Sequence, residues 1–126
     1  ITGFGLAGHL LEMLQGELGA RLTLDCLPLM PGAVSLFQAG FHSTMQAPNQ
    51  RSIGSALQHS VHEGDARLSA LFDPQTSGGL LVTVAPDHAN AVSELLKDAG
   101  CYHLPIGTLG QVTEPSSDRA TIKVLS

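Results

Sequence analysis

The stretch that decides the fold is Leu71-Phe-Asp-Pro-Gln-Thr-Ser-Gly-Gly-Leu-Leu81, which continues as Val-Thr-Val over residues 82–84. The Asp73-Pro74 pair opens a turn, because proline fixes its own φ and disfavours helical backbone in the residue before it. The Gly78-Gly79 pair lets the backbone pass where a Cβ would clash. The apolar run over residues 80–84 then predicts a buried strand. A polar loop joined to a rigid strand is a common way to present a binding site, and an ordinary turn before a core strand has the same pattern.

The rest of the chain alternates short helical and strand patterns. Apolar spacing predicts helices over residues 6–18, 33–37, 53–57, 66–72 and 91–96. Gly19 and Gly40 are expected to end the first and second of these helices. Asp87 is expected to cap the last helix, and Gly100 to end it. Strands are predicted over residues 22–26, 80–84, 104–109 and 121–125, and a loop over residues 41–50. Strand, helix and strand after Gly79 predict a βαβ unit with a right-handed crossover. The expected fold class is α/β, with a mixed β-sheet covered by helices.

Size and composition fit one globular domain. A chain of 126 residues can bury a core of its own. The net charge of −5 and the isolated Arg51, Arg67 and Arg119 argue against a nucleic-acid partner. No apolar run is long enough to span a bilayer, and no signal-peptide pattern is present. Cys26 and Cys101 lie far apart in apolar settings, which predicts buried free thiols and a reducing cytoplasm.

A second glycine-rich stretch opens the chain as Ile1-Thr-Gly-Phe-Gly-Leu-Ala-Gly-His-Leu10. Its Gly3-Phe-Gly-Leu-Ala-Gly8 part matches the Gly-x-Gly-x-x-Gly fingerprint, and Asp25 follows where a ribose-binding acid would lie. The strand that must precede the first glycine is missing, because only two residues come before it. A non-catalytic nucleotide-binding or regulatory module using Gly3, Gly5 and Gly8 is therefore the alternative function. In either case the glycines would bring backbone amides close to an anion at a helix N-terminus.

Together the two stretches resemble selenophosphate synthetase (selenide, water dikinase), a family of the aminoimidazole ribonucleotide synthetase superfamily. That family opens its C-terminal domain with Thr-Gly-Phe-Gly-Leu-x-Gly-His-Leu and carries Asp-Pro-Gln-Thr-Ser-Gly-Gly-Leu-Leu later in the same domain. Between them it has a Pro-Leu-x-Pro-Gly-Ala turn, here Pro28-Leu-Met-Pro-Gly-Ala33, and an asparagine near the position of Asn49. The resemblance runs from Ile1 to about Val112.

The resemblance implies that residues 1–126 are a single C-terminal domain of a larger two-domain enzyme. The N-terminal ATP-binding and catalytic domain would be absent, and the opening Ile1 in place of Met agrees with a fragment. The parent enzyme would transfer phosphate from ATP to selenide in the presence of Mg²⁺, giving selenophosphate, AMP and orthophosphate. The catalytic cysteine or selenocysteine belongs to the missing domain, and a metal-binding aspartate is expected just before Ile1. No catalytic or metal-ligating residue is therefore assigned here, and the fragment alone is expected to be inactive and to bind neither ATP nor Mg²⁺ stably.

Ten residues are expected to face the cleft, close to the phosphates. They are Thr2, Gly3, Phe4, Gly5, Asn49, Gln75, Thr76, Ser77, Gly78 and Gly79. The loop over residues 75–79 is expected to be mobile and to face the missing domain, because its polar side chains have no obvious partner. The resemblance also implies that the partners are the enzyme's own N-terminal domain, selenide and ATP, and that the full enzyme is a cytoplasmic homodimer without nucleic-acid or membrane contacts. Whether the parent carries cysteine or selenocysteine, and whether it is fused to another enzyme, stays open.

The histidines give weaker signals. His59 and His62 would share a helix face beside Glu63, but no third ligand lies at metal-binding spacing, which favours a solvated surface pair. His9 lies on the first predicted helix. It would either contact the cleft or form a hydrogen bond within the fold.

Overall fold

The computed structural model describes residues 1–14, 18–111 and 122–126. Its helices and strands are α1 (Gly5–Leu14), β1 (Leu18–Thr23), α2 (Ala33–Gln38), α3 (Gln46–Ile53), β2 (Leu57–His59), α4 (Ala89–Asp98), β3 (Gly107–Gln111) and β4 (Ile122–Leu125). Short 3-10 helices lie among them at Leu24–Cys26, Gly54–Ala56, Ala66–Leu71 and Pro86–His88. No helix in these described ranges is both long and apolar enough to cross a membrane.

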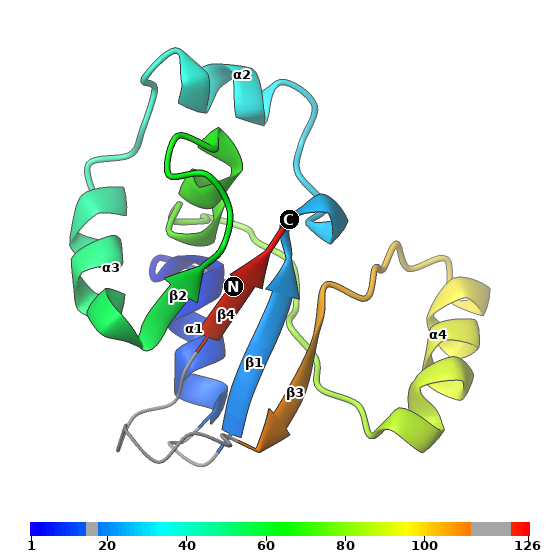
Figure 1. Ribbon diagram of the computed structural model, residues 1–126. Helices are drawn as coiled ribbons and strands as arrows, with labels where there is room; N and C mark the ends of the chain where they lie inside the picture. Colours follow the sequence, from blue (N-terminus) through cyan, green and yellow to red (C-terminus); the bar gives the residue numbers. More distant parts are fainter. Residues whose placement is uncertain (15–17, 112–121) are drawn as a thin grey trace.

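The four strands form one mixed sheet in the order β2-β4-β1-β3 (Figure 1). β4 runs parallel to both β1 and β2, whereas β3 runs antiparallel to β1. The register places Leu22 beside Val124 and Ala20 beside Ile122. The expected α/β class with a mixed sheet and helices is confirmed.

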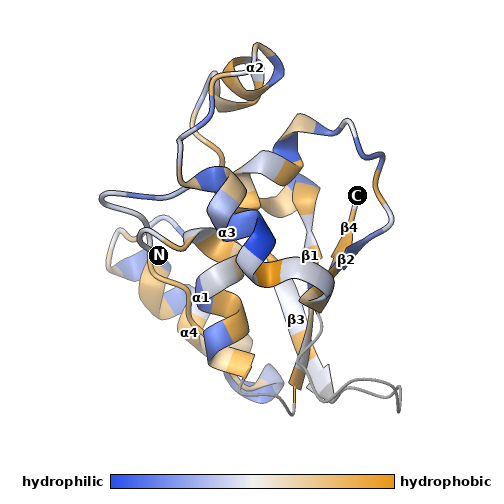
Figure 2. Cartoon of the chain, turned by 90° about the vertical axis from the view of Figure 1, so that its left-hand side faces the viewer, coloured by the Kyte–Doolittle hydropathy of each residue, from blue (hydrophilic) through white to orange (hydrophobic). Residues whose placement is uncertain are grey.

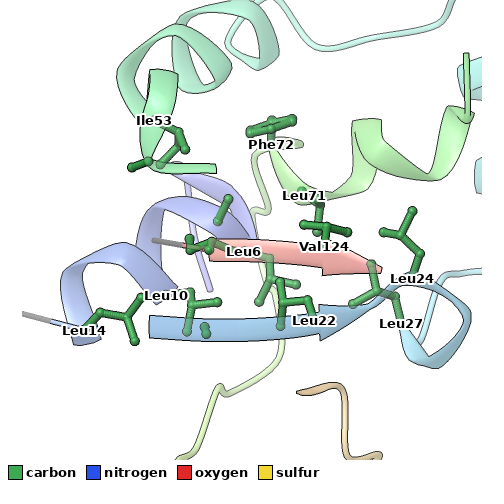
Figure 3. Close-up of a cluster of buried hydrophobic side chains, with 14 residues drawn as sticks. Leu6, Leu10, Leu14, Leu22, Leu24, Leu27, Ile53, Leu71, Phe72 and Val124 are labelled. Carbon is green, nitrogen blue, oxygen red and sulfur yellow. The ribbon is translucent and has the colours of Figure 1, made fainter. Parts of the chain in front are cut away.

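The hydrophobic core lies between one face of the sheet and the helices α1 and α3. Leu6, Leu10 and Leu14 follow helical spacing along the buried side of α1. Figure 3 shows these leucines on α1 in one cluster with residues of β1, β4 and α3 and with Leu71 and Phe72. Each fully buried leucine stabilises the fold by roughly 1.5–3 kcal/mol relative to an exposed one.

Alternation along the two central strands explains why helices cover this face. Ala20 and Leu22 are buried, whereas Arg21 between them is exposed. Ile122 and Val124 are likewise buried on either side of the half-buried Lys123. Because successive side chains point to opposite faces of a strand, the apolar residues meet α1 and the charged ones lie on the other face.

An ion-pair network centred on Arg67 holds the end of β1 against the 66–71 segment. The Arg67 guanidinium donates to Asp65 at 2.6 Å (Nη2 to Oδ2) and also pairs with Asp25. The hydrogen bonds from Arg67 lower the pKa of the Asp65 carboxyl below its ordinary value. Asp25 is therefore engaged within the fold.

The apolar run over residues 80–84 is not a strand, which is the main correction to the expected topology. Leu80 is 91 % exposed and Val82 is 64 % exposed. β1 is already paired with β4 on one side and with β3 on the other, so residues 80–84 cannot pair with this central strand. The expected βαβ unit is consequently wrong, and β3 returns antiparallel to β1. α4 itself forms as expected and ends before Gly100. None of its residues is buried, and it carries both apolar and polar residues (Figure 2).

Several element boundaries also differ from the sequence-based expectation. The predicted first helix ends at Leu14, and Gly19 pairs with Gly110 inside β1 instead of capping that helix. The strand expected over residues 22–26 begins at Leu18 and ends at Thr23, because the chain turns into a 3-10 helix there. The expected loop over residues 41–50 contains the start of α3.

The remaining boundaries shift by smaller amounts. The helix expected over residues 53–57 is a 3-10 turn leading into β2. The expected cap Asp87 lies in a 3-10 turn before α4. β3 begins at Gly107, later than expected, and β4 begins at Ile122, whereas Thr121 lies outside the described residues.

Candidate functional site

The two sequence motifs lie side by side, although 60 residues separate them in the chain. The backbone N–H of Gln75 donates to the carbonyl oxygen of Thr2 at 3.0 Å. The backbone nitrogen of Ile1 donates to the carbonyl oxygen of Gly79 at 2.8 Å. Residues 1–4, the opening segment, are thus bonded to both ends of the polar loop. The two motifs form one surface.

Two glycines allow this close approach of the two backbones. A Cβ added at Gly78 would collide with the carbonyl oxygen of Ile1. A Cβ added at Gly5 would lie 2.9 Å from the carbonyl oxygen of Leu71, and Gly5 has a φ of +70°. Gly3 differs from both, because a Cβ there would meet no atom within 4 Å.

Asn49 joins the helix α3 to both motifs. Its side chain is 4 % exposed. Its Nδ2 donates to the carbonyl oxygen of Gly3 at 2.8 Å and to that of Phe72 at 2.9 Å. One buried amide therefore satisfies carbonyls at the edge of each motif, which explains why an asparagine is useful at this place on α3.

The loop over residues 75–79 forms more hydrogen bonds than the sequence suggests. The Gln75 side chain donates from Nε2 to Asp73 Oδ2 at 2.8 Å, so the expectation that it lacks a partner is wrong. Thr76 and Ser77 are exposed. The loop is anchored by its hydrogen bonds to the opening segment, and not by a following strand.

His9 takes the second of its two predicted roles, as a histidine hydrogen-bonded within the fold. Its Nε2 accepts the backbone N–H of Thr2 at 3.0 Å and lies 2.9 Å from the Thr2 hydroxyl. An accepting Nε2 places the ring proton on Nδ1, which lies 3.3 Å from Oε2 of Glu12. Glu12 was missed by sequence reasoning. The signal that could have found it is the His-x-x-Glu spacing on one helix face.

The predicted site residues also include one aromatic side chain. Phe4 is 57 % exposed beside this surface, and its ring centroid lies 5.8 Å from that of His9. The structure therefore brings all ten predicted site residues into one region, while their contact with a phosphate stays a prediction.

The dinucleotide alternative lacks its structural context. Residues 1–4 form no strand, and α1 begins only at Gly5, the second glycine of the fingerprint. Asp25, the candidate ribose ligand, is paired with Arg67. These contacts weigh against a Rossmann-type site.

The other candidate side chains are engaged locally. His59 ends β2, and its Nδ1 lies 3.0 Å from the carbonyl oxygen of Val61. His62 Nδ1 accepts the backbone N–H of Gly64 at 3.0 Å. Within the ranges that the structure describes, no group of three or more His, Cys, Asp or Glu could hold a metal ion.

Both cysteines are free, but Cys26 is half-buried and Cys101 is exposed, so the expectation of buried thiols is wrong.

Comparison with known families shows which family this chain belongs to. Residues 1–123 match the family described as AIR synthase related protein, C-terminal domain. The chain belongs to this family.

The curated relatives are named selenide, water dikinase. The protein of Shewanella baltica is 38 % identical over 119 residues, which cover 94 % of this chain and 32 % of the relative. The protein of Pseudomonas straminea is 39 % identical over 101 residues, covering 79 % of this chain and 28 % of the relative. The resemblance to selenophosphate synthetase is confirmed, and the AIR synthase related domain spans about a third of the length of these relatives.

Proposed function

We propose that this domain is the C-terminal part of a selenide, water dikinase, which makes selenophosphate from selenide, water and ATP and releases AMP and orthophosphate. In this proposal the surface formed by Thr2, Gly3 and the 75–79 loop is one wall of the active-site cleft. The observation that carries the proposal is the hydrogen bonding of Asn49 and Gln75 to the opening segment, because it gathers the family motifs into one place. The partner of the surface would be the enzyme's own N-terminal domain, in a cytoplasmic homodimer.

This surface is suited to positioning a substrate and excluding water. Thr76 and Ser77 present exposed hydroxyl groups, and the carboxylate of Asp73 is half-buried and accepts from Gln75. A wall of amides and hydroxyls offers hydrogen-bond donors to phosphate oxygens without adding negative charge. Phosphoryl transfer depends mainly on such positioning and on neutralising phosphate charge.

The described residues do not fit a Mg²⁺ site, because none of their acidic or histidine side chains gather in a group of three or more. In the proposal the metal is held by groups outside these residues, among them the family aspartate expected just before Ile1. Mg²⁺ would neutralise phosphate charge in the assembled enzyme.

The proposal predicts that the 126-residue chain alone produces no AMP above a blank when it is incubated with ATP, Mg²⁺ and selenide. The physical reason is that the family's catalytic cysteine or selenocysteine and its metal ligands are expected in the N-terminal domain. The measurement is AMP release followed by chromatography. The matched control is the longer protein that contains this chain, which should release AMP only when selenide is present. Selenide-dependent turnover by the chain alone, or none by the longer protein, contradicts the proposal.

A further inference from the structure

Three polar side chains follow one another at the start of α1. The Thr2 hydroxyl oxygen lies 2.9 Å from His9 Nε2, and His9 Nδ1 lies 3.3 Å from Glu12 Oε2. A hydroxyl, an imidazole and a carboxylate in this order are the groups with which many enzymes take a proton from a hydroxyl. The Thr2–His9–Glu12 chain therefore has the composition of a base, in addition to the bond that holds the backbone of Thr2.

The hydrogen bonds determine the direction in which a proton can move along this chain. The backbone N–H of Thr2 donates to His9 Nε2 at 3.0 Å, so this nitrogen carries a lone pair and no proton. The Thr2 hydroxyl therefore donates to the same nitrogen. The ring proton on Nδ1 faces the carboxylate of Glu12. That carboxylate would stabilise the imidazolium that forms when Nε2 gains a proton.

The hydroxyl end of the chain lies at the proposed cleft wall. Thr2 is exposed, and its carbonyl oxygen accepts the backbone N–H of Gln75 at the start of the polar loop. The His9 side chain is 24 % exposed, and the ring of Phe4 lies beside it with a centroid distance of 5.8 Å. A molecule in the cleft would therefore meet the Thr2 hydroxyl, with the imidazole behind it.

The proposed reaction contains a step that needs a base. ATP carries three phosphoryl groups, of which AMP keeps one and selenide takes one, so the third leaves as orthophosphate. One oxygen of that orthophosphate comes from water, which must lose a proton when its oxygen bonds to phosphorus. Transfer of the terminal phosphoryl group to selenide leaves ADP, so the step that consumes water is the hydrolysis of ADP.

We propose that Thr2 and His9 accept the proton of the water that hydrolyses ADP, an inference that rests on the proposed function. The water oxygen bonds to the β-phosphorus, and the bond from that phosphorus to the bridging oxygen breaks with its electron pair on AMP. The water proton passes to the Thr2 hydroxyl, whose own proton passes to His9 Nε2. The imidazolium then returns the proton to solvent. Thr2 touches the water, His9 acts through Thr2, and Glu12 orients the ring.

A second hydroxyl–imidazole pair provides the matched control. Ser93 Oγ lies 2.7 Å from His103 Nε2, a contact like that of Thr2 with His9. His103 Nδ1 lies 3.1 Å from the carbonyl oxygen of Cys101, where His9 has a carboxylate. Ser93 lies on α4, and the pair belongs to neither motif. Variants of this pair remove the same groups away from the proposed cleft.

The tautomer of His9 is tested first, in the 126-residue chain without substrate. Long-range ¹H–¹⁵N NMR spectra distinguish a ring nitrogen that carries a proton from one that does not. Neutral His9 should carry its proton on Nδ1 and leave Nε2 bare, because Nε2 accepts from Thr2. A neutral His9 with its proton on Nε2 would overturn the proposal, since that nitrogen could not accept a proton from the hydroxyl.

The proton transfer is tested in the longer protein that contains this chain, with ATP, Mg²⁺ and selenide. Thr2→Val removes the hydroxyl, and His9→Gln removes the base. Each should slow AMP formation at least about tenfold and make ADP accumulate, because only the step that consumes water lacks its proton acceptor. Thr2→Ser restores a hydroxyl and should recover most of the rate. Glu12→Gln should have a smaller effect in the same direction, since the Glu12 side chain is 65 % exposed.

The ratio of ADP to AMP, measured by chromatography after quenching, separates this role from a structural one. A variant that only displaces the opening segment should lower both products together. Ser93→Ala and His103→Gln should leave both unchanged. If the unmodified protein forms AMP but Thr2→Val and His9→Gln form it equally fast, or form less of it without accumulating ADP, the proposal is wrong and the proposed function stands. If the unmodified protein forms no AMP, both are wrong.

Discussion

Gly5→Ala should lower the free energy of unfolding of this domain by roughly 2–4 kcal/mol. The backbone of Gly5 has a φ of +70°, a conformation that residues with a Cβ rarely adopt. The added Cβ would also lie 2.9 Å from both the Leu71 carbonyl oxygen and the Phe72 carbonyl carbon. Backbone atoms cannot move aside as a flexible side chain can, so strain and overpacking add. Urea denaturation followed by circular dichroism measures the effect.

Gly3→Ala is the matched control for this prediction. Gly3 belongs to the same motif, but a Cβ there would meet no atom within 4 Å, and the residue is exposed. We expect the free energy of unfolding of Gly3→Ala to stay within about 0.5 kcal/mol of the unmodified chain. If Gly5→Ala were as stable as Gly3→Ala, the close contact between the two motifs would not exist in solution.

Asn49→Leu should destabilise the domain by roughly 2–4 kcal/mol, because it removes two hydrogen bonds and keeps the side chain buried. Without the Nδ2 group, the carbonyl oxygens of Gly3 and Phe72 lose the donor that the structure assigns to them. Leucine keeps the branching at Cγ but is larger, and it cannot replace either bond. Thermal and urea denaturation give the loss of stability, and hydrogen exchange shows where the chain opens.

The location of that opening separates this prediction from a general loss of packing. The amide of Gln75, which donates to Thr2, should exchange faster in Asn49→Leu because the opening segment is no longer held against the 71–75 region. The control variant, Gln50→Leu, changes an exposed neighbour on α3 and should leave stability and exchange unchanged. Equal behaviour of the two variants would show that Asn49 does not connect the motifs.

The fold class was predictable because local patterns determine most of its elements. The apolar spacing of Leu6 and Leu10 predicts α1, and the alternation around Ile122 and Val124 predicts β4. α3 escaped prediction because its sequence is polar and includes Pro48, which a helix tolerates in its first turn, where the missing N–H is not needed. Residues 80–84 were predicted as a strand because their apolar character indicates burial, yet a strand also needs a neighbour to pair with.

The site was predictable in its residues but not in its connections. Short motifs identify Thr2, Gln75 and Asn49 as candidates, yet no local pattern says that their backbones and side chains bond to one another. Such bonds depend on how α1, α3 and the 66–71 segment pack, which is a property of the whole chain. His9 shows the same limit, because its partner Thr2 lies seven residues away in an irregular segment.

We propose that the opening segment, Asn49 and the 75–79 loop form one surface that receives ATP in the longer protein. Hydrogen exchange on that protein, with and without ATP and Mg²⁺, tests this claim most directly. The Gln75 amide should be protected in both states, because it donates to Thr2. The amides of the exposed Thr76 and Ser77 should gain protection only when nucleotide is bound. Unchanged exchange at Thr76 and Ser77, with ATP binding demonstrated by protection elsewhere in the same protein, would contradict the account.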